Sequence, residues 1–363
     1  MSVDSELAAA EVVLGFLEEA EPWRLQSPQF PSKVGGKPAW LSQGGLPSTA
    51  ALQCDLCRLP LAFLLQVYAP ICGQDRSFHR TLFLFCCKNP ECYKHNDSQC
   101  MKVFRSQLPR QNEFYPYDPP SEDEPPVNME LDQGVLPISG VKLCWVCGCP
   151  GNKACSRCHA VTYCGKHHQT LHWKHAHKKE CCSKEASFNN LFPFLFPETE
   201  LVTEPEEEQT DKKKCEQEDD SSVQRSLDCT ALADALSETE LEEMATHETE
   251  DNEIFQQFKK RIDPEPHQVV RYSRGGTPLW VSSQHIPSHQ DIPPCTCGAK
   301  RTFEFQVMPQ LLNSLCVDST GASIDWGTLA VYTCAVSCNH EYHYCQEFIW
   351  KQDFGSDHHI QIK

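Results

Sequence analysis

The chain has 363 residues, 23 of them cysteine, and a formal net charge of −18 from 50 acidic and 32 basic side chains. Its N-terminal stretch is acidic, and the longest apolar run there, 12–17, falls far short of the roughly 18 residues of a membrane span, so we expect neither a secretory signal nor a membrane partner. We therefore expect reduced or metal-bound thiols and a location in cytoplasm and nucleus, while the acidic balance argues against direct nucleic-acid binding.

Residues 12–118 are predicted to form the N-terminal half of a β-rich core. Short apolar runs with β-branched and aromatic residues, such as 64–70, are typical of strands. Cysteine pairs flank these runs, and a zinc ion held by two pairs would tie the strand ends together. The predicted ligands are Cys54, Cys57, Cys87 and Cys92. Cys86, Cys100 and His95 compete for this role, and buried free thiols packed as small hydrophobes are the alternative.

An acidic, proline-rich linker over 119–140 is followed by a small module over 141–184. The module carries eight regularly spaced cysteines and histidines, and each pair can supply half of a tetrahedral zinc site. A segment this short has little core, so metal binding must supply its folding energy, about 10–16 kcal/mol per structural zinc. All eight ligands are used, which favours two structural ions over a catalytic one. The ligands are Cys144, Cys147, Cys155, Cys158, Cys164, His168, His177 and Cys181.

This spacing resembles the MYND zinc finger, and the resemblance implies that alternate pairs share an ion. One zinc would be bound by Cys144, Cys147, Cys164 and His168. The other would be bound by Cys155, Cys158, His177 and Cys181. Many MYND fingers have cysteine at the position of His168, and His167 and His172 are close rivals for its role.

The segment 197–253 contains 21 acidic and 4 basic residues and therefore holds nearly all of the net charge. With so few aromatic residues it cannot bury enough apolar surface to offset the entropy of ordering, so we predict an acidic, largely disordered linker. Near its end, apolar positions that include Phe255 and Phe258 mark one face of a broken amphipathic helix.

Residues 262–352 repeat the landmarks of the N-terminal half in the same order, which indicates a duplicated unit. Each copy has a GG-x-P-x-W segment, a cysteine pair, two apolar runs and a second cysteine pair. The second copy predicts another zinc site at Cys295, Cys297, Cys334 and Cys338. Trp40 and Trp280 of the repeated segment are expected to anchor each loop to its own sheet.

These observations predict an α+β fold that is mainly β. A zinc-stapled duplicated core, made from two halves that pack against each other, is interrupted by the two-zinc finger and by disordered acidic linkers. Two zinc ions are expected in the finger and two more in the core. The motifs GxSxG and HExxH and a glycine-rich cofactor loop are absent from the sequence, so no enzyme activity is predicted.

The order of parts resembles the programmed cell death protein 2 family over nearly the full length, with matching runs at 30–36, 107–110 and 324–327. That family shares its core domain with the yeast twenty-S rRNA accumulation proteins. The resemblance implies a mainly β domain built from both halves. It also implies a dedicated chaperone that escorts one newly made small-subunit ribosomal protein, the homologue of bacterial S-five, and so supports small ribosomal subunit biogenesis.

The acidic charge suits such a client, because ribosomal proteins are basic and an acidic partner attracts them and competes with RNA. The alternative function is a transcriptional corepressor scaffold, linked to cell proliferation and apoptosis, in which the MYND finger binds corepressor peptides.

Overall fold

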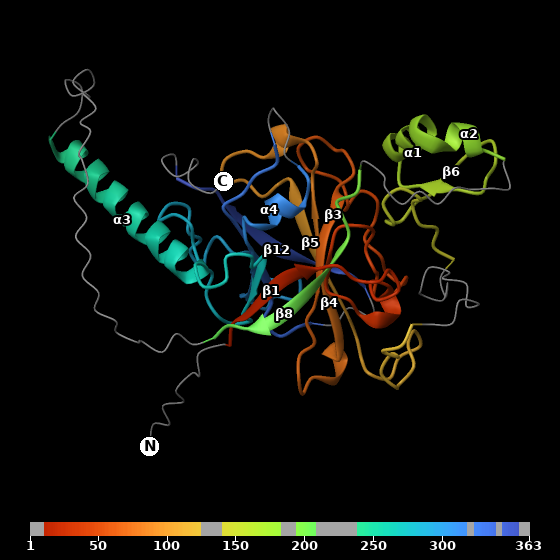
Figure 1. Cartoon of the computed structure of the whole chain (residues 1–363), viewed down its shortest axis with the longest axis horizontal. Helices are drawn as coiled ribbons and strands as arrows, with labels where there is room; N and C mark the ends of the chain where they lie inside the picture. The colour runs from red at the N-terminus through yellow and green to blue at the C-terminus, as the bar shows by residue number, and fades with distance from the viewer. Residues whose placement is uncertain are drawn as a thin grey trace.

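The computed structural model of the protein describes residues 11–124, 140–182, 194–207, 238–317, 323–338 and 343–355, with the backbone alone for 238–249. Within these residues, ten strands form a closed barrel, with the finger at one side and a long helix at the other (Figure 1). Every neighbouring pair of barrel strands is antiparallel. The fold is therefore mainly β, as predicted.

The barrel takes strands from both ends of the chain. They are β1 (Val13–Glu18), β2 (Lys33–Val34), β3 (Ala62–Tyr68), β4 (His79–Cys86), β5 (Met101–Leu108), β8 (Thr199–Pro205), β9 (Val270–Tyr272), β10 (Arg301–Val307), β11 (Thr328–Cys334) and β12 (Cys345–Gln352). Their order around the barrel is β1-β8-β2-β3-β4-β5-β12-β11-β10-β9. The two halves thus meet twice, where β5 pairs with β12 and where β1 pairs with β9.

Short helices lie in the loops of the barrel, and the finger and one long helix lie outside it. The short ones are η1 (Ser27–Gln29), η2 (Asp75–Ser77), η3 (Pro90–Cys92) and α4 (Leu311–Ser314). The finger consists of β6 (Lys153–Ala154), β7 (Thr162–Tyr163), α1 (Lys166–His172), the π-helical segment η4 (Trp173–His177) and α2 (Lys178–Glu180). The long helix is α3 (Glu238–Ile262). Among the described residues, no helix combines the length and the apolar character needed to cross a membrane.

The duplication expected from the sequence is visible in the hydrogen bonds of the two halves. The backbone N–H of Ala39 donates to Gln66 Oε1 at 2.9 Å, and the equivalent N–H of Leu279 donates to Gln306 Oε1 at 2.6 Å. Each glutamine amide also donates back to the carbonyl of the same residue. In addition, the pairings β3–β4 and β10–β11 carry a bulge at equivalent points. Each repeated tryptophan loop is therefore fixed to its own half by one glutamine.

Trp40 contacts more than the sheet of its own half. Its ring lies 5.1 Å from that of Phe83 in β4 and 5.2 Å from that of Tyr344, beside β12. Its indole N–H donates to the carbonyl of Gly148, in the finger, at 2.8 Å. Trp280, by contrast, packs within its own half. Trp40 thus joins the N-terminal half, the C-terminal half and the finger.

The strand β8 corrects the prediction for 197–253, because residues 199–205 of this acidic segment belong to the barrel. β8 pairs with β1 on one side and with β2 on the other. Two acidic side chains of the segment form ion pairs with the N-terminal half. Lys33 Nζ lies 2.5 Å from Glu198 Oε1, and Arg24 Nη2 lies 3.2 Å from Glu200 Oε1. Overall composition did not reveal this strand, because its stability depends on pairing with β1 and β2 and on burial of Leu201, which exist only in the folded core.

The end of the same segment lies in α3, where the sequence predicted helix. Phe255 and Phe258 are fully buried and pack against Val281, Met308 and Phe354. The helix is therefore attached to the C-terminal half through its last turns. The rest of the predicted linkers, at 125–139 and 208–237, lies outside the described residues.

Two ion pairs connect the halves inside the barrel. Arg80 in β4 and Glu304 in β10 are fully buried and form a bidentate pair, with 2.7 Å between Nη2 and Oε2. Arg105 in β5 and Glu347 in β12 pair at 2.7 Å between Nε and Oε1. Burial opposes ionisation of Glu304, but the charge and hydrogen bonds of Arg80, with help from Thr333, outweigh it and lower its pKa.

Glu304→Gln is expected to destabilise the protein by about 3–5 kcal/mol, because it leaves the charge of Arg80 buried without its counter-ion. Denaturant unfolding followed by circular dichroism measures the change. Arg24→Gln, which breaks the ion pair at the surface, is the control and should leave the unfolding midpoint nearly unchanged. If both variants shifted the unfolding midpoint by the same amount, the buried pair would contribute no more to stability than the surface pair.

Candidate metal centres

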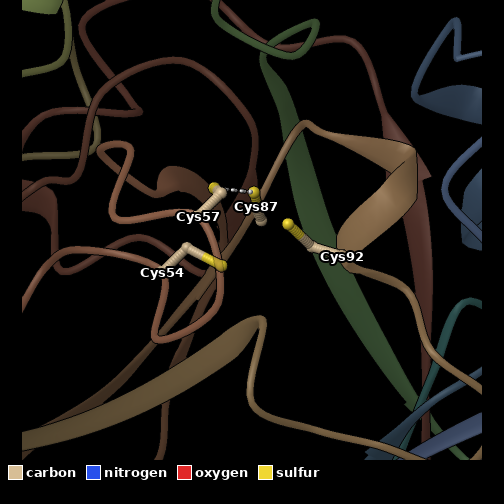
Figure 2. A group of neighbouring side chains, drawn as sticks. All are labelled: Cys54, Cys57, Cys87 and Cys92. Atoms are coloured by element: carbon tan, nitrogen blue, oxygen red, sulfur yellow. Dashed lines mark hydrogen bonds between the residues drawn. The ribbon is translucent and has the colours of Figure 1, made fainter.

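The four predicted cysteines of the N-terminal half converge at one end of β3 and β4 (Figure 2). Cys54 and Cys57 lie in the loop before β3, Cys87 directly follows β4, and Cys92 ends η3. The four Sγ atoms lie within 4.8 Å of one another, and those of Cys57 and Cys87 are 3.6 Å apart. A tetrahedral zinc with Zn–S bonds of about 2.3 Å places its sulfur atoms about 3.8 Å apart, so the cluster fits this ion.

The C-terminal half builds the equivalent cluster at the equivalent strand ends. Cys295 and Cys297 precede β10, Cys334 ends β11, and Cys338 follows in the next loop. The Sγ atoms of Cys295 and Cys338 are 3.6 Å apart, and those of Cys297 and Cys334 are 3.7 Å apart. The close spacing of the Cys295–Cys297 pair, with a single residue between them, is thus compatible with a tetrahedral arrangement.

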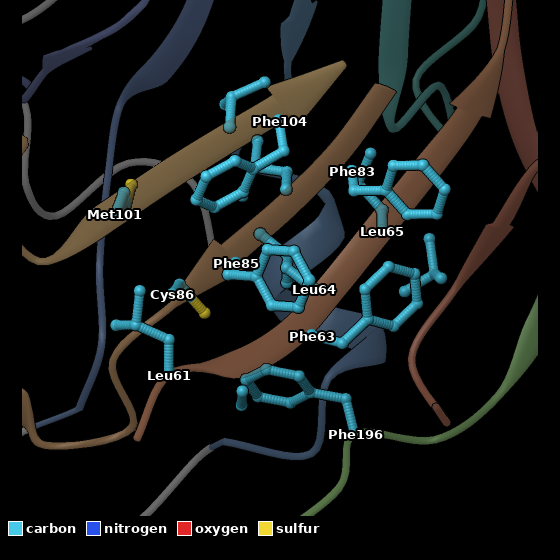
Figure 3. Close-up of a cluster of buried hydrophobic side chains, with 14 of the residues drawn as sticks. Leu61, Phe63, Leu64, Leu65, Phe83, Phe85, Cys86, Met101, Phe104 and Phe196 are labelled. Carbon is cyan, nitrogen blue, oxygen red and sulfur yellow. The ribbon is translucent and has the colours of Figure 1, made fainter. Parts of the chain in front are cut away.

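Cys86, Cys100 and His95, the rival ligands of the N-terminal cluster, lie outside the group of four thiols. Cys86 is fully buried in the hydrophobic core, where Figure 3 shows it near Leu61 and Met101. Cys100 is also fully buried, and burial raises the pKa of both thiols, that of Cys86 to about 12. His95 is largely exposed and faces Asp353 at 3.6 Å. The two cysteines therefore pack as neutral small side chains, as reduced cysteine commonly does.

The finger brings together the two interleaved quartets that the MYND resemblance implied. The first consists of Cys144, Cys147, Cys164 and His168, and the second of Cys155, Cys158, His177 and Cys181. In the first, the Sγ atoms of Cys147 and Cys164 are 3.9 Å apart and His168 Nδ1 lies 3.1 Å from Cys164 Sγ. In the second, His177 Nε2 lies 3.4 Å from Cys158 Sγ.

The helical part of the finger decides between the histidines. His168 lies on the buried face of α1 with Nδ1 toward the thiols, whereas His167 is exposed. His172 stacks on Trp145, with ring centroids 3.7 Å apart, and its Nδ1 lies 2.9 Å from the hydroxyl of Tyr163. The π-helical segment then adds the extra residue per turn that brings His177 round to the second quartet. No sequence pattern indicated this π-helical segment.

Backbone amides favour the thiolate form in three of the four clusters. The amide of Ala299 lowers the pKa of Cys297 to about 7. Burial opposes ionisation of Cys57 and Cys155, but backbone amides two or three residues further along the chain outweigh it, and the pKa of Cys155 falls to about 6. Because the thiolate is the form that binds metal, these loops are prepared for zinc.

All described cysteines are free thiols, and the separations within the clusters are far longer than the roughly 2.05 Å of a disulfide bond. The donor set of cysteine with one histidine or none is the one that structural zinc prefers. The finger and the two core clusters therefore fit zinc binding. In each cluster the ion would be enclosed by four protein ligands and would act as a structural crosslink.

Each core cluster is held in place by the opposite half of the barrel. Arg105 of the N-terminal half donates to the carbonyl of Cys338 at 2.9 Å and contacts its Sγ at 3.4 Å. Lys351 of the C-terminal half donates to the carbonyl of Lys94, in the loop after Cys92, at 3.2 Å. Zinc binding and association of the halves should therefore support each other. Sequence reasoning missed both contacts, because nothing local marks an arginine or lysine for this role.

Comparison with known proteins agrees with this architecture. Three protein-family models match the chain. The family model "Programmed cell death protein 2, N-terminal domain" matches residues 11–122, and "Programmed cell death protein 2, C-terminal putative domain" matches residues 252–353. The family model of the MYND finger matches residues 144–181. The strand β8 lies outside all three ranges.

Several relatives match over most of their length. Programmed cell death protein 2 of Bos taurus is 51% identical over 350 residues, which cover 95% of this chain and 97% of the relative. Programmed cell death protein 2-like of Homo sapiens is 27% identical over 344 residues, 85% of this chain and 87% of the relative. Probable 20S rRNA accumulation protein 4 of Schizosaccharomyces pombe is 24% identical over 360 residues, 86% and 88% of the two chains. No solved structure matches the chain.

Native mass spectrometry of the intact protein is expected to find about four zinc ions, one for each cluster of four ligands. Cys155→Ser should remove one ion and leave the unfolding of the barrel unchanged, since its cluster is the more distant part of the finger. Cys295→Ser should remove at least one ion and also unfold the core. A Cys295→Ser protein that kept its full zinc content would disprove the assignment of this cluster.

Arg105→Gln is expected to speed zinc loss to a chelator by about tenfold for one of the ions, because groups behind metal ligands commonly contribute 10–100-fold to affinity. Stepwise zinc release from the full chain measures the effect. Glu304→Gln is the matched control, because it weakens the barrel but keeps the contact between Arg105 and Cys338. If both variants released zinc at the same rate, general loosening of the barrel would explain the result.

Proposed function

The chain belongs to the programmed cell death protein 2 family, and on that premise we propose that it is a dedicated chaperone for a newly made small-subunit ribosomal protein, the homologue of bacterial S-five. It binds this client in the cytoplasm, escorts it toward the nucleus and so supports biogenesis of the small ribosomal subunit. The proposal rests on the similarity to a fission-yeast relative that is named for accumulation of 20S rRNA. This relative is 24% identical over an alignment that covers 86% of this chain.

Charge supports this function. The protein has a net charge of −18, and ribosomal proteins are basic because they contact RNA. An acidic partner attracts such a client over distances of about a Debye length and competes with nonspecific binding to RNA. The zinc clusters suit an escort that needs a rigid surface, since each uses four protein ligands and leaves no open position for substrate.

The second candidate function is the corepressor scaffold linked to proliferation and apoptosis, in which the finger binds proline-containing peptides. It rests on the match to the MYND finger alone. The two functions differ in the part of the chain that they require, since a scaffold depends on the finger and an escort depends on the barrel.

A tagged pull-down of the intact chain at moderate salt, with protein synthesis running and then blocked, separates the two functions. The expected result is one small-subunit ribosomal protein in stoichiometric amount, which disappears when synthesis stops and persists in Cys155→Ser. Capture of corepressor or chromatin proteins that is lost in Cys155→Ser and indifferent to synthesis would replace the escort by the scaffold.

A further inference from the structure

Three exposed hydrophobic side chains come from separate segments at the same end of the barrel, where β4 begins and where β5 and β11 end. Phe78 precedes β4 and is 38% exposed, Tyr117 follows β5 and is 62% exposed, and Val336 follows β11 and is 50% exposed. Exposed apolar groups that cluster on a protein surface commonly mark an interaction site. We call this group, together with Arg110, the Phe78–Tyr117 patch.

Arg110 connects the two rings of the patch. Its guanidinium carbon lies 5.1 Å from the ring centroid of Phe78 and 4.0 Å from that of Tyr117. Behind them, His79 packs edge-on against Phe78 and stacks on Phe30, with ring centroids 4.1 Å apart. Phe78 is therefore held by His79 and Arg110 before any partner arrives, which lowers the entropy cost of binding.

The patch spans both halves of the protein. The guanidinium of Arg76 donates to the carbonyl of Val336 at 2.9 Å, and the hydroxyls of Ser77 and Ser337 are 3.3 Å apart. Val336 lies between Cys334 and Cys338 of the C-terminal cluster. The patch therefore forms only when the barrel is closed and that loop is in place.

Exposed carboxylates surround the patch along the chain. Asp75 precedes Phe78, Glu113 lies between Arg110 and Tyr117, and Asp118 directly follows Tyr117. The exposed run Glu122, Asp123 and Glu124 continues the same segment, which Gln29 holds through the carbonyl of Ser121 at 3.3 Å. These six acidic groups outnumber the three nearby cations, Arg76, Arg110 and Arg24, the last of which interacts with Glu122, so the surroundings of the patch are negative.

We propose that the Phe78–Tyr117 patch binds a basic, arginine-containing segment of the client, an inference that rests on the proposed function and names its binding surface. A client guanidinium stacks on the exposed face of Tyr117 and extends the alternation of rings and cations that Arg110 begins. The carboxylates nearby pair with the remaining basic side chains. Single-stranded RNA, which also stacks on aromatic rings, is repelled by the same carboxylates.

The test measures binding of the purified ribosomal client to the full chain by titration calorimetry at several salt concentrations. Tyr117→Ala is expected to weaken binding by about tenfold, the loss that one desolvated cation–π contact supplies. Tyr117→Phe, which keeps the ring, should bind as the unchanged chain does. Ile286→Ala is the matched control, because Ile286 is 42% exposed and lies outside the patch. Asp118→Asn combined with Glu122→Gln should weaken binding and reduce its salt dependence.

Unchanged client affinity in Tyr117→Ala would overturn the surface while leaving the proposed function standing. If the unchanged chain bound no ribosomal client, the proposed function would fail, and fluorescence anisotropy with labelled octa-arginine and octa-lysine would test the surface by itself. Preference for arginine that is lost in Tyr117→Ala supports the proposal. Equal affinity for both peptides, or binding of oligouridine that depends on Tyr117, overturns it.

Discussion

Closure of the barrel between β5 and β12 is the contact on which the rest of the structure depends. Here the two halves share only three residue pairs, whereas β4 and β5 within one half share eight. Main-chain pairing this short is weak, and side chains reinforce it through Arg105 with Glu347 and Arg80 with Glu304. Buried ion pairs of this kind contribute little net stability but exclude wrong partners, since an unpaired buried charge is costly. Both pairs therefore oppose separation of the two halves, because separation would break them and leave the strand ends unpaired.

The zinc clusters of the core also connect the two halves. Each core cluster fastens loops of its own half, and each of these loops is bound by a cation of the other half, Arg105 in one case and Lys351 in the other. The finger is also tied to the barrel, because Val146 is fully buried and Trp40 bonds to Gly148. The two core metal sites and the closure of the barrel thus depend on one another, and the finger is held against the barrel through Trp40. For the proposed escort function, such rigidity would keep the binding surface defined before a client binds.

Much of the metal chemistry could be predicted from the sequence, because ligand spacing is a local property. A tetrahedral ion requires pairs of ligands at short separations, so the ligand pairs could be recognised before any fold was known. How the pairs of the finger share two ions was implied by the resemblance to the MYND finger. The duplicated landmarks likewise indicated two equivalent units, and Gln66 and Gln306 now show why the motif recurs. The resemblance favoured His168 and left His167 and His172 as rivals, because spacing alone does not show the phase of α1 or the stacking of His172 against Trp145.

The sequence by itself therefore determined the local features, which are the cysteine pairs, the strands beside them and the repeated tryptophan loops. It also determined the resemblance of the whole chain to a known family. Only the tertiary structure decided how these parts close on one another. It placed β8, from an acidic segment whose composition favoured a linker, between β1 and β2, where Arg24 pairs with Glu200 of the strand and Lys33 pairs with Glu198 directly before it. It also paired Arg80 with Glu304 across more than two hundred residues of chain. Such contacts leave no local pattern, because their free energy exists only once the distant partner is in place.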